Sequence, residues 1–223
     1  MKIHNQIREA LLPILPASMD IARRFSLPCE YKAGNRPRHF AGNLADPLAV
    51  RLILLLAEPG SAPGAEEINR DEVTWLQDVT CDGLGNGGFR LRYDDRSIGP
   101  YEINPREFIK MIWPDESYAE RMEKVVITNS FSMQAWTSGG PIPPQAAKEY
   151  GVYLKRFINV FSNATIVAAG KKAENRALWA RIPALPIRAF TPPGSNQQAA
   201  SISWRMAAEA IRAGLGLTCH DNV

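Results

Sequence analysis

The sequence has no long hydrophobic run and contains little cysteine. Its longest uninterrupted apolar run, Leu52 to Ala57, is far shorter than the roughly 20 residues of a membrane-spanning helix. Pro13 and Pro16 interrupt the apolar stretch near the N-terminus, where a secretory signal needs a continuous apolar segment. The three cysteines are far apart, which argues against a disulfide framework, a zinc site and an iron–sulfur cluster. We therefore expect a cytoplasmic protein with reduced thiols and no membrane contact.

Several sequence motifs of common enzymes are also missing. The three histidines lack metal-ligand spacing, there is no Gly-x-Ser-x-Gly nucleophile motif, and no Gly-Lys-Ser/Thr follows the apolar run at 52–57. The glycine-rich segment Asp82–Gly88 neither follows a predicted strand nor opens a helix, which favours a flexible loop over a dinucleotide site. These absences predict a protein that works without a metal or cofactor.

The composition of the 223 residues, 45% hydrophobic and 22% charged, is that of one globular domain with a substantial core. The net charge of +3 is unevenly distributed: about +4 over residues 1–56, −7 over 57–124 and +6 over 125–223. The basic last segment is consistent with a surface for a polyanion, and an ordinary solvated surface is the alternative.

Four short apolar runs predict buried parallel strands: Val50–Ala57, Val125–Asn129, Thr165–Ala169 and Pro186–Phe190. Helical patterns follow or separate them at Asn104–Trp113, Asp115–Lys124, Pro144–Phe161, Lys171–Arg181 and Ser201–Ala213, with Asn104 and Ser201 as expected N-caps. This alternation predicts an α/β fold, a three-layer α/β/α sandwich with a central four-stranded parallel sheet. Residues 1–45 are expected to be a helical extension packed on the core of a single domain, with Arg23, Arg24, Arg36 and Arg38 exposed.

The chemistry-bearing residues follow the predicted strands, where ligands bind in sheets of this kind. Glu58, with Pro59 and Gly60 behind it, could activate water, and Asn129 could pair with the edge of a nucleobase. The loop from Thr191 to Asn196 carries Ser195, which could hold a phosphate. A structural turn is the alternative at each position.

Together these segments resemble the uracil-DNA glycosylase superfamily. In that family the first strand ends in a water-activating loop, the second brings a base-reading Asn, the third runs into a Gly-x-x-Ala turn, and the fourth ends in a (His/Asn)-Pro-Ser loop. The matching segments in this sequence are Ala57–Gly60, Asn129, Gly170–Ala173 and Thr191–Ser195, so the resemblance covers residues 50 to 213.

The resemblance implies a hydrolase that flips a nucleotide out of DNA and cleaves the bond between base and sugar. Glu58 would be the catalytic residue. The substrate would be held by Asn129, Gly60, Thr191 and Ser195 and by a stacking aromatic, for which Phe89 is preferred over Tyr93, Tyr101 and Phe131. An exposed basic face with Lys171, Lys172, Arg176 and Asn196 would contact the DNA.

Two positions depart from the family pattern. Glu58 stands where Asp or Asn is more common, and Thr191 stands where the strongest catalysts have His. The polar run Asn196–Gln198 offers no apolar wedge for opening a duplex, which favours single-stranded DNA. Two alternatives stay open: a base- or nucleic-acid-binding module of weak or no activity, and an interaction protein without a nucleic-acid role.

Overall fold

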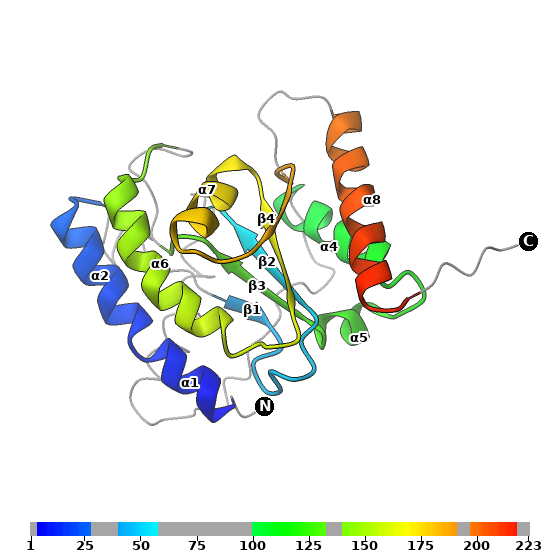
Figure 1. The fold of residues 1–223 in the computed structure, drawn as a ribbon, viewed down its shortest axis with the longest axis horizontal. Coiled ribbons are helices and arrows are strands. Elements are labelled where there is room, and N and C mark those ends of the chain that lie inside the picture. Colours follow the sequence, from blue (N-terminus) through cyan, green and yellow to red (C-terminus); the bar gives the residue numbers. More distant parts are fainter. Residues whose placement is uncertain (1–3, 28–39, 58–99, 133–139, 191–196, 218–223) are drawn as a thin grey trace, which may run out of the picture.

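The computed structural model describes residues 4–27, 40–57, 100–132, 140–190 and 197–217. A sheet forms its centre, with strands in the order β1-β3-β2-β4-β5 (Figure 1). Four of them are parallel: β2 (Leu52–Leu56), β3 (Val125–Asn129), β4 (Thr165–Ala169) and β5 (Leu185–Ile187). The predicted four-stranded parallel sheet is thus confirmed.

A short strand that the sequence did not predict extends the sheet. β1 (Phe40–Gly42) pairs antiparallel with β3, within the segment expected to hold only helices. A three-residue strand is too short to show an alternating pattern, which explains why it was missed. Gly42 permits the pairing, because its φ is +111° and a Cβ there would lie 1.9 Å from the carbonyl oxygen of Val125.

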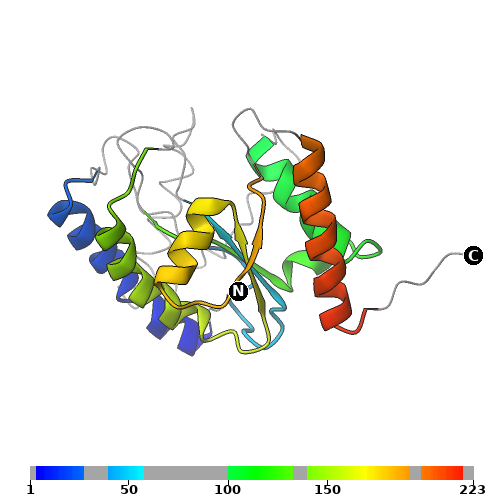
Figure 2. The same cartoon turned by 45° about the horizontal axis from the view of Figure 1, so that its top comes forward.

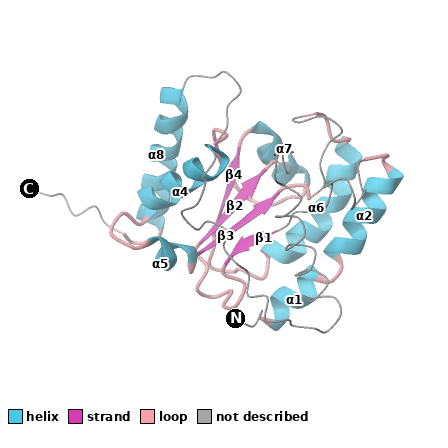
Figure 3. Ribbon diagram, turned by 180° about the vertical axis from the view of Figure 1, so that it is seen from behind, coloured by secondary structure: helices cyan, strands magenta, loops and turns pink. Residues whose placement is uncertain are grey.

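Helices cover both faces of the sheet, as the sandwich prediction requires. One face carries α1 (Asn5–Leu11), α2 (Ile14–Arg24), α6 (Pro144–Ile158) and α7 (Lys171–Trp179). The opposite face carries α4 (Pro100–Ile112), α5 (Tyr118–Met122) and α8 (Gln197–Gly214). Figure 2 shows the two helical layers on either side of the sheet, and Figure 3 shows the strands between them from behind.

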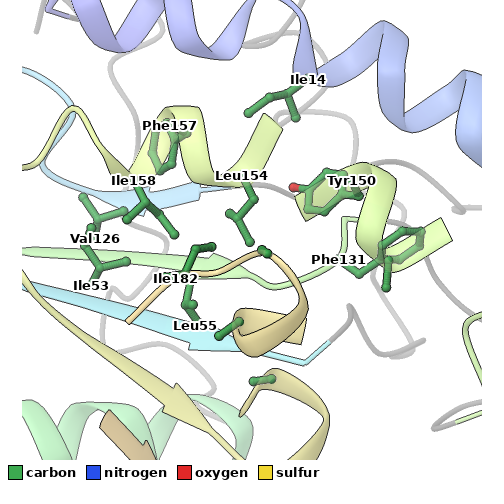
Figure 4. Packing of buried hydrophobic residues seen from close by; sticks show 14 of the residues in the cluster. Ile14, Ile53, Leu55, Val126, Phe131, Tyr150, Leu154, Phe157, Ile158 and Ile182 are labelled. Atoms are coloured by element: carbon green, nitrogen blue, oxygen red, sulfur yellow. The ribbon is translucent and has the colours of Figure 1, made fainter. Parts of the chain in front are cut away.

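Alternate residues of the strands pack into two separate hydrophobic cores, one on each face of the sheet. Ile53 and Leu55 of β2 pack with Leu154 of α6 on the first face (Figure 4), whereas Leu52 and Leu54 pack on the second face. Both faces of β2 are buried because it lies at the middle of the parallel strands, and this explains its uninterrupted apolar run.

The N-terminal helices pack on the core as expected, through Ile7, Leu11, Ile14 and Ile21. Arg23 and Arg24 of α2 are exposed, and Arg24 forms ion pairs with Asp20 (2.8 Å) and with Glu149 of α6 (2.6 Å). Arg36 and Arg38 lie outside the described residues.

The two predicted N-caps are wrong, because α4 and α8 begin four residues earlier than expected. Asn104 lies inside α4, and its side-chain amide donates to the carbonyl of Phe190. Ser201 lies inside α8 and donates to the carbonyl of Gln198 at 2.9 Å. A polar residue at such a position can bond to its own helix or to a distant loop as readily as it can cap the helix N-terminus. The sequence pattern alone therefore does not decide where the helix begins.

Within the described ranges, no helix is both long enough and apolar enough to pass through a bilayer.

Candidate functional site

The described part of the predicted site is the carboxyl edge of the parallel sheet, which we define by the strand ends Ala57, Asn129 and Gly170. The next described element after β2 is α4, on one face of the sheet, and the element after β4 is α7, on the other face. β2 and β4 are neighbours, so the described helices that follow these two adjacent strands lie on opposite faces. A sheet of this connectivity binds ligands in the crevice at such a switch point.

Asn129 lies beside the end of β2. The register pairs it with Leu56, and neighbouring strands are about 4.8 Å apart. Asn129 is half-buried and has interaction partners of its own. Because strand side chains alternate, it is on the same face as Val125 and Ile127, the face covered by α4 and α8. An amide at this position can both donate and accept hydrogen bonds at the carboxyl edge.

The pairing of β2 and β3 continues past the ends of the strands. The Ser130 amide donates to the Leu56 carbonyl at 2.7 Å, and the Phe131 amide donates to the Ala57 carbonyl at 3.2 Å. The Ser130 hydroxyl donates to the same Ala57 carbonyl at 2.8 Å. Ala57 therefore uses both lone pairs of its carbonyl oxygen to hold the exit of β3.

Gly170 ends β4 and forms the N-cap of α7, with φ +89° and ψ 160°. Essentially only glycine adopts this backbone conformation. Its amide donates to Ile187 at 2.9 Å, and its carbonyl accepts from the Glu174 amide at 3.0 Å, which starts the helix. The first turn of α7, with Lys171 and Lys172, therefore begins directly at the carboxyl edge.

Lys171 and Lys172 are exposed, as a DNA-contacting face requires. Lys171 forms an ion pair with Glu174 at 2.9 Å, on side chains that are 74% and 38% exposed. Lys172 donates to the Gly140 carbonyl at 3.1 Å. An exposed pair such as Lys171–Glu174 contributes little to stability, so Lys171 can exchange its carboxylate partner for a phosphate at small cost.

Arg176 is not on the exposed basic face, so its predicted location is wrong. It is 5% exposed, and its guanidinium donates to the Ser130 hydroxyl at 3.4 Å and lies 5.8 Å from the centre of the Phe131 ring. The inward face of α7 consists of Ala173, Arg176 and Ala177, whereas Leu178 is 72% exposed. Ala173, Arg176 and Ala177 share one face at helical spacing, and Leu178 lies about 100° away from Ala177.

Phe131 is also unavailable as a base-stacking ring. It is 1% exposed, and its ring packs edge-on against Tyr150 with the centres 5.3 Å apart (Figure 4). The described residues do not include six predicted site residues: Glu58, Gly60, Phe89, Thr191, Ser195 and Asn196. Tyr93 and the side chain of Tyr101, the other candidate stacking aromatics, also lie outside them.

A small group of buried polar side chains lies behind the exit of β3, and no local sequence pattern indicates it. Ser132 donates to the hydroxyl of Ser18 at 2.8 Å, and Ser18 donates to the Ile14 carbonyl at 2.7 Å. Burial raises the pKa of the Tyr150 phenol above its ordinary value of 10, and the nearby Ser132 hydroxyl offsets part of this rise. The phenol oxygen itself has no partner at hydrogen-bond geometry. The Ser18–Ser132 bond links α2 to the segment that follows Asn129, and the ring contact between Tyr150 and Phe131 links α6 to it.

The segment before Thr191 is anchored on the other face. Phe190 packs against Phe108 of α4 and Trp204 of α8, with ring centres 5.8 Å and 5.2 Å apart. The indole of Trp204 donates to the Arg188 carbonyl at 2.9 Å. The chain therefore leaves β5 from a fixed position.

The described residues contain no group of three or more His, Cys, Asp or Glu that could bind a metal ion. Comparisons with protein-family models and with curated protein sequences found no match to this chain.

Proposed function

We propose that this protein is a uracil-DNA glycosylase-like hydrolase that cleaves the N-glycosidic bond of a flipped uracil or damaged base in DNA. One observation carries the proposal: Asn129 is in register with Leu56, so an amide lies beside the strand end that continues two residues later into Glu58. Base recognition and water activation need these two residue types at the same edge.

In the proposed reaction, Asn129 bonds to the edge of the base and Glu58 orients a water molecule. The water attacks C1′ of the sugar and gives a proton to Glu58, while the base leaves with the electron pair of the C1′–N bond. The negative charge of Glu58 also stabilises the positive charge that develops on the sugar. Lys171 and Lys172 are exposed next to this edge and would contact phosphates.

An excision assay tests the proposal. The full chain is incubated with single- and double-stranded oligonucleotides that contain one uracil, and alkali-labile abasic sites are counted. We expect cleavage that is lost in Glu58→Gln and Asn129→Ala. The matched controls are Glu209→Gln, an exposed carboxylate on α8, and Asn163→Ala, an exposed amide at the amino end of β4. Both controls should keep the activity of the unaltered chain.

A second candidate function is a module that binds a base or nucleic acid without cleaving it. The observation in its favour is Thr191, which stands where an imidazole would stabilise the departing base. By analogy with the loss of an oxyanion-hole donor, this absence is worth about 10²- to 10³-fold in rate. Binding without abasic sites, unchanged by Glu58→Gln, would support the module. No binding at low salt would instead favour an interaction protein.

A further inference from the structure

Two buried polar side chains lie behind the carboxyl edge, on the face opposite to Asn129. Ser130 is 1% exposed and Arg176 is 5% exposed. Ser130 alternates with Asn129 along the chain and is on the α6 and α7 face, where it meets Arg176 from the inward face of α7.

The Ser130 hydroxyl both donates and accepts a hydrogen bond. Its proton is donated to the Ala57 carbonyl at 2.8 Å, and its oxygen accepts from the Arg176 guanidinium at 3.4 Å. This chain of bonds, which we call the edge clamp (Arg176, Ser130 and Ala57), joins α7 to the exits of β3 and β2. The same guanidinium lies against the Phe131 ring, so it also holds the residue that follows Ser130.

We propose that Ser130 and Arg176 are positioning residues of the carboxyl edge. They fix the exit of β2, which leads to Glu58, against the exit of β3, which carries Asn129. Since Asn129 is on the α4 and α8 face and the clamp is on the other, the clamp acts through the backbone and touches no substrate. The catalytic meaning of this inference rests on the proposed function, whereas the mechanical link between the strand exits does not.

The catalytic consequence is measured by single-turnover excision of uracil from single-stranded DNA. Displacing a reacting group by about 1 Å can lower a rate 10²-fold. In Ser130→Ala we therefore expect a rate constant about 10- to 100-fold lower, with the Kd for uracil-containing DNA within about twofold. With folded enzyme saturating and in excess over the DNA, a loss of folded protein alone would leave the rate constant unchanged, which would overturn the positioning role.

Two further variants make the test specific. Ser130→Thr retains the hydroxyl and should restore most of the rate. Arg176→Gln should resemble Ser130→Ala, while Arg156→Gln, which removes an exposed cation from α6, should behave as the unaltered chain does. A Ser130→Thr rate as low as that of Ser130→Ala in folded protein would contradict the clamp.

A readout that does not need activity separates the two proposals. In protein labelled with ¹⁵N at asparagine, the side-chain amide signal of Asn129 is assigned by its loss in Asn129→Ala. We expect this signal to shift in Ser130→Ala and to return in Ser130→Thr. A shift in a chain without excision activity would reject the glycosylase and keep the clamp, and an unchanged signal would overturn the clamp.

Discussion

Ala189 lies directly against the backbone of Gly170. A Cβ added at Gly170 would come within 2.9 Å of the Cβ of Ala189, on a residue whose φ is already +89°. The start of α7 at the carboxyl edge thus depends on a residue without a side chain.

Gly170→Ala is therefore expected to destabilise the fold by about 1–3 kcal/mol, because the backbone conformation is strained for alanine and Ala189 must move. The measurement is urea unfolding followed by circular dichroism. Gly214→Ala is the matched control: its Cβ would meet nothing within 4 Å at the end of α8. This control should be neutral or stabilising by up to about 1 kcal/mol. Equal effects of the two substitutions would contradict the prediction.

The Ser18–Ser132 hydrogen bond should couple α2 to the segment after Asn129. Ser132→Ala and Ser18→Ala each remove one partner from a buried pair, and each is expected to lower the free energy of unfolding by about 1–2 kcal/mol. The double variant should lose less than the sum, with a coupling energy of about 1 kcal/mol in a double-mutant cycle. Additive losses would show that the two hydroxyls do not act together.

Tyr150 should make the fold sensitive to alkali. Burial raises the pKa of its phenol in the folded state above the unfolded value of about 10. The folded state then holds a proton that the unfolded state releases, so this contribution is complete below pH 10 and is lost as the pH rises further. Stability measured between pH 9 and 11 should fall less steeply in Tyr150→Phe.

Tyr153→Phe, on the same helix and only half-buried, is the control for the loss of a phenol hydroxyl. At neutral pH, Tyr150→Phe is expected to change the free energy of unfolding by less than about 1 kcal/mol, since the phenol oxygen has no well-formed hydrogen bond. An unaltered alkaline slope in Tyr150→Phe would contradict the assigned cause.

The two lysines at the start of α7 give a prediction about DNA binding. If Lys171 and Lys172 each contact one phosphate, replacing both by Gln should reduce the slope of log K against log salt by about 1.4 on single-stranded DNA. Arg156→Gln is the control for loss of an exposed positive charge. Fluorescence anisotropy at several salt concentrations measures the slope, and no change in it would remove these lysines from the binding surface.

The local elements were largely predictable. β3 and β4 have the predicted bounds, because short segments made up mostly of apolar residues are typical of strands buried on both faces. The helix predicted over Pro144–Phe161 is α6, and its buried residues include Tyr150, Leu154 and Phe157, because apolar residues recur there at helical spacing.

The candidate site was predictable only in part. Strand ends indicated that Asn129 belongs to it, but the register with Leu56 depends on a pairing between segments some seventy residues apart. The resemblance put Arg176 on a basic face that contacts DNA, and only the rotation of α7 on the sheet places it next to Ser130.

The sequence by itself therefore determined which segments are strands and helices and which face of α6 is buried, since these follow from residue spacing within a single element. The tertiary structure decided the strand order, the addition of β1, and the hydrogen bonds by which Ser130 joins the ends of β2 and β3. These features arise from hydrogen bonds and packing between distant segments, and no local periodicity records which segments become neighbours.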